Sequence, residues 1–476
     1  MSETSIRTGD AAALGLLDAH DQAALVRRGE VSAGELVEAA ITRIEALDPV
    51  LNAVSHTDFA AARSRAAVGG TGGLAGVPYL LKDSVSYPGM PSRSASAALD
   101  DSPASAMFPF VARLEEQGLI PLGKTTMSEF GLLPSNESRR YGVTRNPWNA
   151  GHTTGGSSGG AGSAVASGMV PVAHASDAAG SIRIPASCCG LVGLKASRGA
   201  NVRARARHLF DDILCSDGVL ARSVRDVAWV FAAVHADGNV SPVDRGPDGR
   251  LRIGLMLEAP GRAQPHPAVS EAIERTAALC EGLGHRVEPV ALPFDGDNFI
   301  AAFKTLWAYL GADVADFCRN RFPDRPLGAM LEDWPIGLSE WADTLGGLDL
   351  ERSYRLFGDI PPAYEALFGT FDVILSPVMA EHGVAIERFS GMRPWRALLD
   401  DMMDVIPYTP VQNVTGNPSI SLPVTAALDG MPVGSMFTAA RGQDNLLLAL
   451  ALELEAAAPW SDRWPETSAA TLAISA

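Results

Sequence analysis

The segment from Gly151 to Gly199 limits the fold more than any other part of the chain. Glycine, serine and alanine dominate it, and phenylalanine, tyrosine and tryptophan are absent. Because such small side chains let backbones approach one another closely, the segment suits a site that is built from main-chain groups. Inside it, we predict a helix of small residues over Ala161–Ser167 and a buried strand over Val170–Ala175.

On both sides of this segment, short apolar runs alternate with helical patterns. The apolar runs predict strands at Val77–Leu81, Leu119–Leu122, Leu251–Met256, His285–Val290, Phe371–Leu375, Ser419–Pro423 and Pro432–Thr438. Periodic apolar positions and end signals predict one helix from Ser32 to Asp48-Pro49 and others over Val111–Gln117, Ala268–Glu281 and Asn445–Ala457. This alternation indicates an α/β protein with a central sheet. Because no linker interrupts it, we expect residues 1–476 to form a single domain.

Composition and charge exclude several classes of protein. The 38 basic and 55 acidic residues give a net charge of −17, which repels phosphate backbones and disfavours nucleic acid as a partner. The longest apolar run, Leu446–Leu452, is too short to span a membrane. The N-terminus lacks the layout of a secretory signal, and the five cysteines show no Cys-x-x-Cys spacing. We therefore expect a cytoplasmic protein without a disulfide framework or a cysteine-bound metal.

Only four of the basic residues are lysines, namely Lys82, Lys124, Lys195 and Lys304. Lys82 ends the apolar run Tyr79-Leu80-Leu81, where burial would disfavour its ammonium form. A lysine must be neutral to act as a base, and at its ordinary pKa this costs about 4.6 kcal/mol at pH 7. Burial reduces that cost, so Lys82 is a candidate base.

The run Gly155-Gly156-Ser157-Ser158-Gly159-Gly160 admits three interpretations. A phosphate-binding loop is excluded, because Gly160 is followed by Ala161 where that loop needs a lysine. A nucleophile elbow of the α/β-hydrolase type fits the letters Gly155-x-Ser157-x-Gly159, but loop-forming residues rather than a strand precede it. The third interpretation is a flexible glycine and serine loop. The run by itself leaves the last two interpretations open.

A series of short motifs extends over roughly residues 20 to 460. The motifs are Leu80-Leu81-Lys82-Asp83, Gly123-Lys124-Thr125, Asn146-Pro147-Trp148-Asn149, Gly155 to Gly160, Asp177 to Pro185, Cys189 to Lys195, Leu220 to Asp226, Asn413 to Pro418 and Gly430 to Gly434. Together they resemble the amidase signature hydrolases. The run from His174 to Cys189 and the tail from Gly430 to Trp460 look most similar to the group that hydrolyses the 6-aminohexanoate cyclic dimer.

The resemblance implies a relay of three residues. Lys82 matches the base, Ser157 matches a serine that follows a cis peptide bond and passes the proton, and Ser181 matches the nucleophile. Ser181 would attack an amide carbonyl and form an acyl-enzyme, which water then hydrolyses. Such a relay uses no histidine, no metal and no cofactor.

The resemblance also assigns supporting roles. The backbone amides that match the oxyanion loop are those of Ala178, Ala179, Gly180 and Ser181. Ser158 is expected to hydrogen-bond Lys82. Asp177 and Arg183 would brace the loop, although a plain structural ion pair explains these two residues equally well. The family usually has glycine where this chain has Ala179, so we expect a stiffer oxyanion loop or a narrower pocket here.

The resemblance implies a central mixed, twisted sheet flanked by helices, with a catalytic core at about residues 75–230 and a helical insert at about residues 294–371. The residues expected to line the substrate pocket are Leu132, Leu133, Trp307, Tyr309 and Tyr408. For Tyr408, ordinary core packing is the favoured interpretation. Leu132 and Leu133 make the pocket apolar where some cyclic-amide enzymes offer a polar side chain, so linear, aryl and cyclic amides all stay open as substrates.

The sequence therefore predicts an amidohydrolase that cleaves a small carboxylic amide through an acyl-serine. One alternative is a protein similar to the A subunit of amidotransferases, which works with partner subunits on aminoacyl-tRNA and which the charge of −17 disfavours. The other is a serine esterase with its nucleophile elbow at Ser157. Neither nucleic acid nor a membrane is expected as a partner, and a homodimer is common among similar enzymes.

Overall fold

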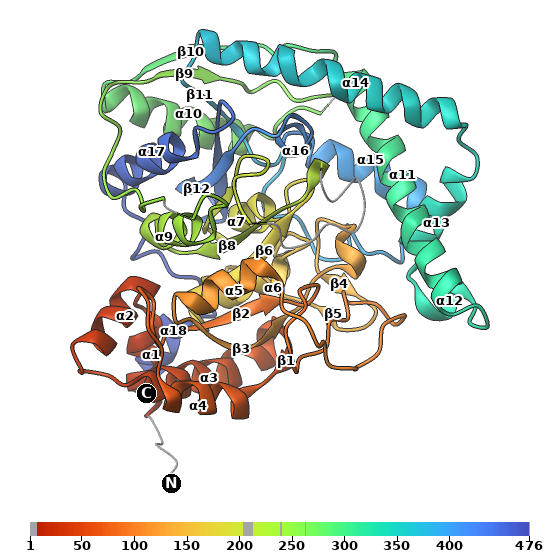
Figure 1. Cartoon of the computed structure of the whole chain (residues 1–476). Coiled ribbons are helices and arrows are strands. Elements are labelled where there is room, and N and C mark those ends of the chain that lie inside the picture. Colours follow the sequence, from red (N-terminus) through yellow and green to blue (C-terminus); the bar gives the residue numbers. More distant parts are fainter. Residues whose placement is uncertain (1–6, 203–212, 239, 262, 476) are drawn as a thin grey trace.

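A computed structural model describes residues 7–202, 213–238, 240–261 and 263–475 of the chain. Its strands are β1 Val54–Thr57, β2 Pro78–Lys82, β3 Ile120–Thr125, β4 Glu137–Ser138, β5 Gly142–Val143, β6 Val172–Asp177, β7 Val192–Lys195, β8 Ser216–Ala221, β9 Arg252–Leu255, β10 Arg286–Pro289, β11 Val373–Pro377, β12 Ser419–Ala426 and β13 Pro432–Ala439. Eleven of them form one sheet in the order β1-β3-β2-β6-β8-β7-β12-β13-β11-β9-β10 (Figure 1). β4 and β5 form a separate hairpin.

The large sheet is mixed. β2 is parallel to β3 and β6, and β9 is parallel to β10 and β11, whereas the strands from β6 to β11 in the middle of the sheet pair antiparallel. The predicted α/β class with a central sheet is confirmed.

Helices cover both faces of this sheet. They are α1 Thr8–Gly15, α2 Ala19–Arg27, α3 Ala33–Leu51, α4 Phe59–Val68, α5 Pro109–Glu116, α6 Gly159–Ala166, α7 Arg183–Cys189, α9 Val224–Val234, α10 Pro267–Gly282, α11 Gly296–Arg321, α12 Leu327–Met330, α13 Asp333–Ala342, α14 Gly347–Glu365, α15 Trp395–Val405, α16 Pro410–Thr415, α17 Asp444–Ala457 and α18 Ala469–Ser475. Two short 3-10 helices, η1 Glu129–Gly131 and η2 Ala366–Gly369, lie between them.

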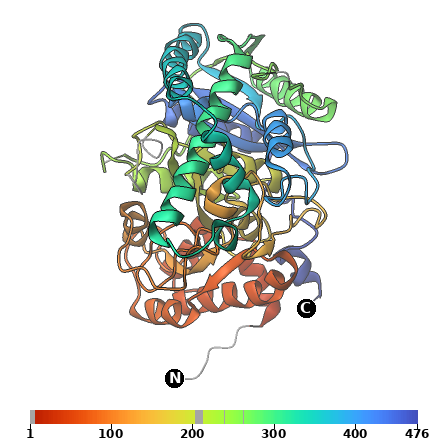
Figure 2. The same cartoon turned by 90° about the vertical axis from the view of Figure 1, so that its right-hand side faces the viewer.

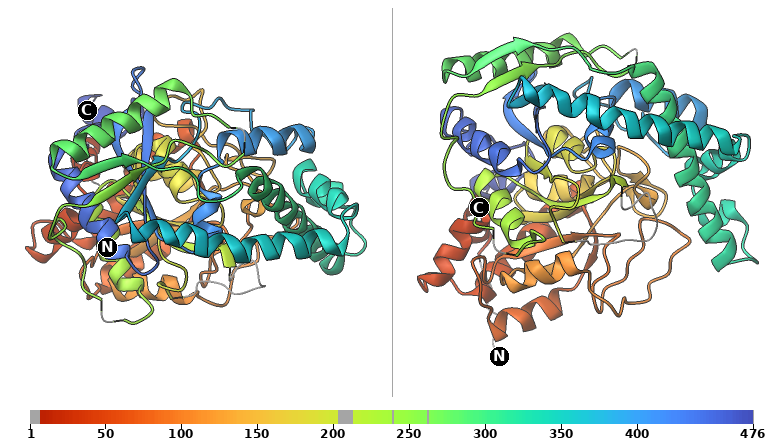
Figure 3. Two further views of the ribbon diagram at one scale, coloured as in Figure 1. Left: turned by 90° about the horizontal axis from the view of Figure 1, so that it is seen from above. Right: turned by 45° about the horizontal axis from the view of Figure 1, so that its top comes forward.

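Side chains alternate between the two faces of each strand, and this divides the core. In β2, Tyr79 and Leu81 pack on the face that α5, α9, α10 and α17 cover, whereas Leu80 packs on the opposite face with α3 and α6. In β11, Leu375 likewise faces α10, and Ile374 faces the helices α11 to α16. Figure 3 shows this end of the sheet between α10 and α14.

The two helices of small residues lie directly on the middle of the sheet. α7 contacts β7, β12 and β13, and α6 contacts α7, β6 and β8. A Cβ atom at Gly193 of β7 would lie only 2.9 Å from Ala186 Cβ and from Ile182 Cγ2 of the segment above it. The small residues of this region therefore permit a close approach of backbones, as the composition predicts.

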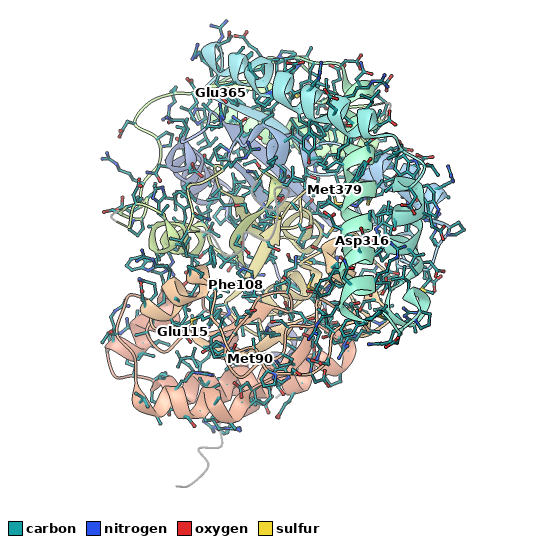
Figure 4. All side chains as sticks on the ribbon, turned by 45° about the vertical axis from the view of Figure 1, so that its right-hand side comes forward. Met90, Phe108, Glu115, Asp316, Glu365 and Met379 are labelled. Carbon is teal, nitrogen blue, oxygen red and sulfur yellow. The ribbon has the colours of Figure 1, made fainter. Side chains whose placement is uncertain are left out.

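A helical segment from α11 to α14 extends from the sheet and folds back along one side of the molecule. α11 packs against α13 and α14. Figure 2 shows α11 running across the front of the core, and in Figure 4 Asp316 marks α11 while Met379 marks the region just after β11. This segment therefore faces the part of the core that contains the small-residue region.

One predicted boundary is wrong. α3 does not end at Asp48-Pro49 but includes Pro49 in its last turn and ends at Leu51. Asn52 then adopts a left-handed conformation (φ 51°), and its N–H donates to Asp48 O. The Asp48 carboxylate accepts hydrogen bonds from the N–H groups of Ala53 and Val54, which stabilises the exit from the helix despite the proline.

Within the described ranges, every helix is too short or too polar to span a lipid bilayer.

Candidate active site

Lys82 is the last residue of β2 and is only 1% exposed. Its Nζ atom donates hydrogen bonds to the hydroxyl groups of Ser157 (2.7 Å), Ser158 (2.8 Å) and Ser176 (3.1 Å). β2 and β6 are parallel neighbours, so their carboxyl ends meet at one edge of the sheet and bring Lys82 beside Ser176. A buried amine is thus surrounded by three serine hydroxyl groups.

Ser157 and Ser158 lie in a tight loop that leads into α6. The peptide bond between Gly156 and Ser157 is cis, as the family resemblance implies. A Cβ atom at Gly156 would lie 2.5 Å from Ser135 N, so only glycine fits at this position. Ser158 precedes the first residue of α6, and its hydroxyl group also donates to Ser176 O (3.2 Å). The loop is therefore fixed from both sides.

The chain before Ser157 is not a strand. Residues 150–158 form turns, bends and an isolated bridge, and β5 ends at Val143. A nucleophile elbow requires a strand that runs directly into the serine. The local structure therefore does not support the esterase alternative.

The loop between β6 and α7 wraps around the carboxylate of Asp177. Asp177 accepts hydrogen bonds from the N–H groups of Gly180 (2.7 Å) and Ile182 (3.2 Å). It also forms a two-pronged ion pair with Arg183 Nε and Nη2, each at 2.9 Å. Asp177 is 1% exposed and Arg183 is fully buried. The pair therefore fixes the loop that carries Ser181.

Electrostatics favour the charged form of Asp177. Burial by itself would raise its pKa, but the Arg183 guanidinium and the hydrogen bonds from Arg183 and Asn413 outweigh burial and lower the pKa to about 2. Arg183 also donates to Gln412 Oε1 (2.9 Å) and Asn413 Oδ1 (2.6 Å) at α16. The braced loop is thereby tied to α16.

The backbone amides of this loop differ in their partners. The N–H of Gly180 donates to the Asp177 carboxylate, so in this structure the Gly180 amide supports the loop. The N–H groups of Ala178, Ala179 and Ser181 have no acceptor among the described residues, and neither does the Ser181 hydroxyl group. Ala178 and Ser181 line the cavity described next, whereas the N–H of Gly180, which the sequence places in the oxyanion loop, donates to Asp177.

Ser181 and Lys82 line the same cavity, which has a volume of about 310 Å³. Its polar lining includes Lys82, Ser84, Ser94, Ser157, Ser176, Ser181 and Asp313. Its apolar lining includes Leu99, Met127, Phe130, Leu132, Trp307, Leu310, Val314 and Phe317. The serines and Lys82 are therefore joined to a largely apolar space that α11 closes on one side.

Two of the five residues expected in the pocket line this cavity, Leu132 and Trp307. The other three do not belong to its lining. Leu133 is buried beside it, Tyr309 is half-buried on α11, and the Tyr408 hydroxyl group donates to Leu257 O (2.7 Å) in the core. Sequence spacing finds the right elements, but it does not give the direction of each side chain.

Several residues at the site were not singled out by sequence reasoning. Ser176 is the third hydroxyl group at Lys82, and Thr409 donates to Ala179 O (2.6 Å) and supports the oxyanion loop from α16. The signal for Ser176 was available, because Ser176 and Lys82 both lie at the ends of neighbouring strands. Thr409 is 230 residues away from Ala179, and no local pattern connects the two.

In the part of the chain that the structure describes, no group of three or more histidine, cysteine, aspartate or glutamate side chains is placed to hold a metal ion. The five cysteines, all within the described residues, form no disulfide bond.

Comparison with known proteins agrees with this geometry. The family model for amidases matches residues 35–448. The chain is 35% identical to the 6-aminohexanoate-cyclic-dimer hydrolase of Paenarthrobacter ureafaciens, over 94% of this chain and 96% of the relative. It is 39% identical to AmiC of Mycobacterium leprae, itself only assigned as an amidase, over 94% of this chain and 97% of that protein.

Solved structures give the same result. The structure of 6-aminohexanoate cyclic dimer hydrolase complexed with substrate superposes with a TM-score of 0.86 at 32% identity, covering 95% of this chain and 99% of the other. A bacterial aryl acylamidase of the amidase signature family superposes with a TM-score of 0.84 at 27% identity, covering 94% and 97%. The chain therefore belongs to the amidase signature family and is a hydrolase that acts on carbon–nitrogen bonds of carboxylic amides.

Proposed function

We propose that this enzyme hydrolyses a neutral carboxylic amide through an acyl intermediate on Ser181, with Lys82 as the base and Ser157 as the proton carrier. The observation that carries the proposal is the buried Lys82 amine, whose Nζ atom lies 2.7 Å from Ser157 Oγ while both residues line one cavity with Ser181. No described histidine or metal site lines that cavity.

The proposed reaction has two halves. Neutral Lys82 takes a proton from Ser157 as Ser157 takes the proton of Ser181, and Ser181 Oγ attacks the amide carbonyl carbon. The amides of Ala178, Ala179 and Ser181 stabilise the developing oxyanion. The amine leaves with the proton that the relay returns. Water then attacks the acyl group by the same route and releases the carboxylic acid, so one water is consumed for each amide cleaved.

The cavity supports an uncharged substrate with an apolar group. Its lining combines aromatic and aliphatic side chains from η1 and α11, for example Phe130, Trp307 and Val314. The net charge of −17 also disfavours anionic substrates. We therefore propose aryl and short alkyl amides, linear or cyclic, as the substrate class.

The test removes the nucleophile and the base one at a time. Ser181→Ala and Lys82→Ala should each lower kcat/KM on the best amide of a linear, aryl and cyclic panel by at least about a thousandfold, because each removes a group of the relay. Ser270→Ala is the matched control, since it deletes a half-buried hydroxyl group on α10. Labelling with a fluorophosphonate should modify the peptide that contains Ser181.

Normal turnover by Ser181→Ala, or an adduct on Ser157 in place of Ser181, would contradict the proposal. Co-purification of stoichiometric partner subunits would instead favour the amidotransferase alternative. The cytoplasmic location and the homodimer stay predictions.

A further inference from the structure

Two buried carboxyl groups outside the relay lie next to the substrate cavity. Glu129, the first residue of η1, is 4% exposed, and Glu332, which directly precedes α13, is 2% exposed. Within the described residues the contacts of both groups are hydrogen bonds rather than ion pairs. Burying a carboxyl group without a cation is costly, so its position requires an explanation.

The Glu129 carboxyl group joins three separate parts of the chain. Its Oε1 accepts a hydrogen bond from Ser96 Oγ (2.7 Å), and its Oε2 accepts one from the N–H of Glu332 (2.8 Å). Ser96 Oγ also contacts Met330 O (3.2 Å), at the end of α12. Glu129 therefore connects η1 to the loop around Ser96 and to the start of α13.

The residues after Glu129 form one side of the cavity, and we name Phe130 to Leu132 the wall segment. Phe130 has a positive φ of 49°, which is unfavourable for an aromatic residue, and its N–H donates to Ser94 O (2.9 Å). A Cβ atom at Gly131 would lie 3.3 Å from Ser157 Oγ, so the wall segment directly adjoins the relay serine.

The wall segment is also tied to the helical segment of α11 to α14. The carbonyl oxygen of Leu132 accepts hydrogen bonds from the indole N–H groups of Trp307 on α11 and Trp334 on α13, both at 3.1 Å. Glu129 and Leu132 thus attach both ends of the wall segment to α13, and Leu132 attaches it to α11 as well. A strained residue between two fixed ends keeps its conformation only while both ends hold.

We propose that Glu129 is a positioning residue for the hydrolysis, whose carboxyl group holds the wall segment against the substrate and Ser157 by linking it to Ser96 and to α13. This inference rests on the function proposed above. Glu129 itself does not line the cavity, so it acts through Phe130, Gly131 and Leu132.

The charges around Glu129 make the link sensitive to pH. Burial and then the neighbouring Glu332 carboxyl group raise the pKa of Glu129 to about 7. Arg139, in the turn between β4 and β5, opposes this shift. Further charged or titratable groups near the link are Cys318 of α11, Arg140, which donates to Ser96 O, and Arg325, which donates to Ala97 O. The hydrogen bonds from Ser96 and from the Glu332 N–H favour the ionised form of Glu129, but burial and the Glu332 carboxyl group outweigh them. The buried arrangement is therefore most stable when Glu129 is protonated, and it loses stability as Glu129 ionises.

Glutamine reproduces the protonated form of Glu129. Its amide oxygen can accept from the Glu332 N–H, and its NH₂ group can donate to Ser96 Oγ. The Ser96 hydroxyl proton can then be donated to Met330 O, while Ser96 Oγ still accepts from the N–H of Ala98 (3.2 Å). Alanine leaves Ser96 and the Glu332 N–H without their partner.

The experiment measures kcat and KM for wild type, Glu129→Gln and Glu129→Ala from pH 6 to pH 8.5. We expect the KM of the wild type to rise by roughly threefold to tenfold over this range, since a linked shift of one pKa unit changes affinity tenfold. Glu129→Gln should keep the low KM at every pH. Glu129→Ala should raise KM by about tenfold at all pH values and change kcat by less than about threefold, because the contacts of Lys82 do not pass through Glu129.

Glu455→Gln is the matched control. Glu455 lies on α17, accepts from the Val224 N–H, and burial raises its pKa to about 7 as well. It does not line the cavity, so Glu455→Gln should keep the KM profile of the wild type. A change in KM shared by both glutamine variants would mean that any buried carboxyl group has this effect, and would overturn the proposal.

A second readout does not depend on turnover. Because Trp307 and Trp334 both bind Leu132 O, Glu129→Ala should change the tryptophan emission and its quenching by acrylamide, and Glu129→Gln should not. If the wild type cleaves no amide, the proposed function fails, and this readout still tests the link. A second outcome is an active wild type with two variants, Glu129→Gln and Glu129→Ala, whose KM equals that of the wild type at every pH. In that case the inference fails and the proposed function stands.

Discussion

At the scale of single residues, the relay depends on how many hydroxyl groups surround one amine. Lys82 has three serine neighbours, of which two, Ser157 and Ser158, lie next to each other in the chain and the third, Ser176, comes from β6. Three neighbours fix the direction of the Nζ atom better than two. Ser176 should therefore contribute to catalysis without taking part in proton transfer to Ser181.

Ser176→Ala should lower kcat by about tenfold, which corresponds to about 1.4 kcal/mol and is typical of one lost hydrogen bond at a site of this kind. KM should change little. Ser167→Ala is the control, because the Ser167 side chain is also buried and its hydroxyl group donates to Ala164 O, away from Lys82. Steady-state kinetics of both variants test this, and a kcat of wild-type size in Ser176→Ala contradicts it.

The individual residues also show what a sequence can predict. Lys82, Ser157 and Ser181 belong to motifs of adjacent letters, so the resemblance assigns their roles directly, and these roles stay predictions until the variants are measured. Glu129 and Thr409 make their contacts with residues far away in the chain, at Glu332 and Ala179. Such pairs arise only when the chain has folded, and no local pattern identifies them.

At the scale of helices and strands, the fold depends on how closely α7 can approach the sheet. Gly193 of β7 lies under α7, and an added Cβ would lie 2.9 Å from Ala186 Cβ and 3.0 Å from Leu220 Cδ2. Leu220 Cδ2 ends a side chain that can rotate, but Ala186 Cβ can move only together with the backbone of α7. A methyl group at this position should therefore push α7, and the Ser181 loop before it, away from the sheet.

Gly193→Ala should destabilise the protein by about 1–3 kcal/mol, as expected when a close-packed core receives an extra carbon. Gly249→Ala is the control, because nothing lies within 4 Å of a Cβ at that position. Urea denaturation at equilibrium gives the free energy of unfolding of both. Equal stability of Gly193→Ala and wild type would show that α7 can move without cost.

The strands that were predicted from apolar runs all exist, with ends displaced by a few residues, as β3 shows at Ile120–Thr125. The sequence did not indicate β1, β7, β8 or the hairpin of β4 and β5. Most of these strands are short, and β7 lies in the small-residue region, where its pairing with β8 and β12 rather than its own apolar pattern makes it a strand. The predicted end of α3 at Pro49 is wrong because the Asp48 carboxylate accepts hydrogen bonds from the chain just after the helix, which stabilises a helix end beyond the proline.

At the scale of the whole molecule, the free energy of unfolding should depend on the few cationic side chains that are buried. Lys195 is 2% exposed, and its Nζ donates to Ala196 O (2.8 Å). Burial and then the Arg183 guanidinium lower its pKa to about 7, although Asp177 and Asp444 oppose the shift. Between pH 7 and its ordinary pKa, the unfolded chain binds a proton that the folded protein does not.

Because the unfolded chain binds more protons there, this lysine makes the free energy of unfolding increase as pH rises from 7 to about 10, by up to about 5 kcal/mol. Lys195→Met should remove this dependence, so it should be more stable than the wild type at pH 7 and lose that advantage towards pH 10. Lys304→Met is the control, since Lys304 pairs with the largely exposed Asp400. Urea melts at pH 7, 8 and 9 test this, and a stability difference that stays constant with pH contradicts it.

The placement of α11 has a consequence for how such an enzyme can diversify. Trp307, Leu310, Asp313, Val314 and Phe317 reach the cavity from successive turns of this one helix, whereas the relay and the braced loop come from the sheet and the small-residue region. Replacements between Trp307 and Phe317 of α11 can therefore change which substrates enter the cavity while the proton path stays as it is. Substrate choice and bond cleavage therefore depend on different segments of the chain. Substitutions on one face of α11 are expected to change which amides the enzyme binds without changing how it cleaves them.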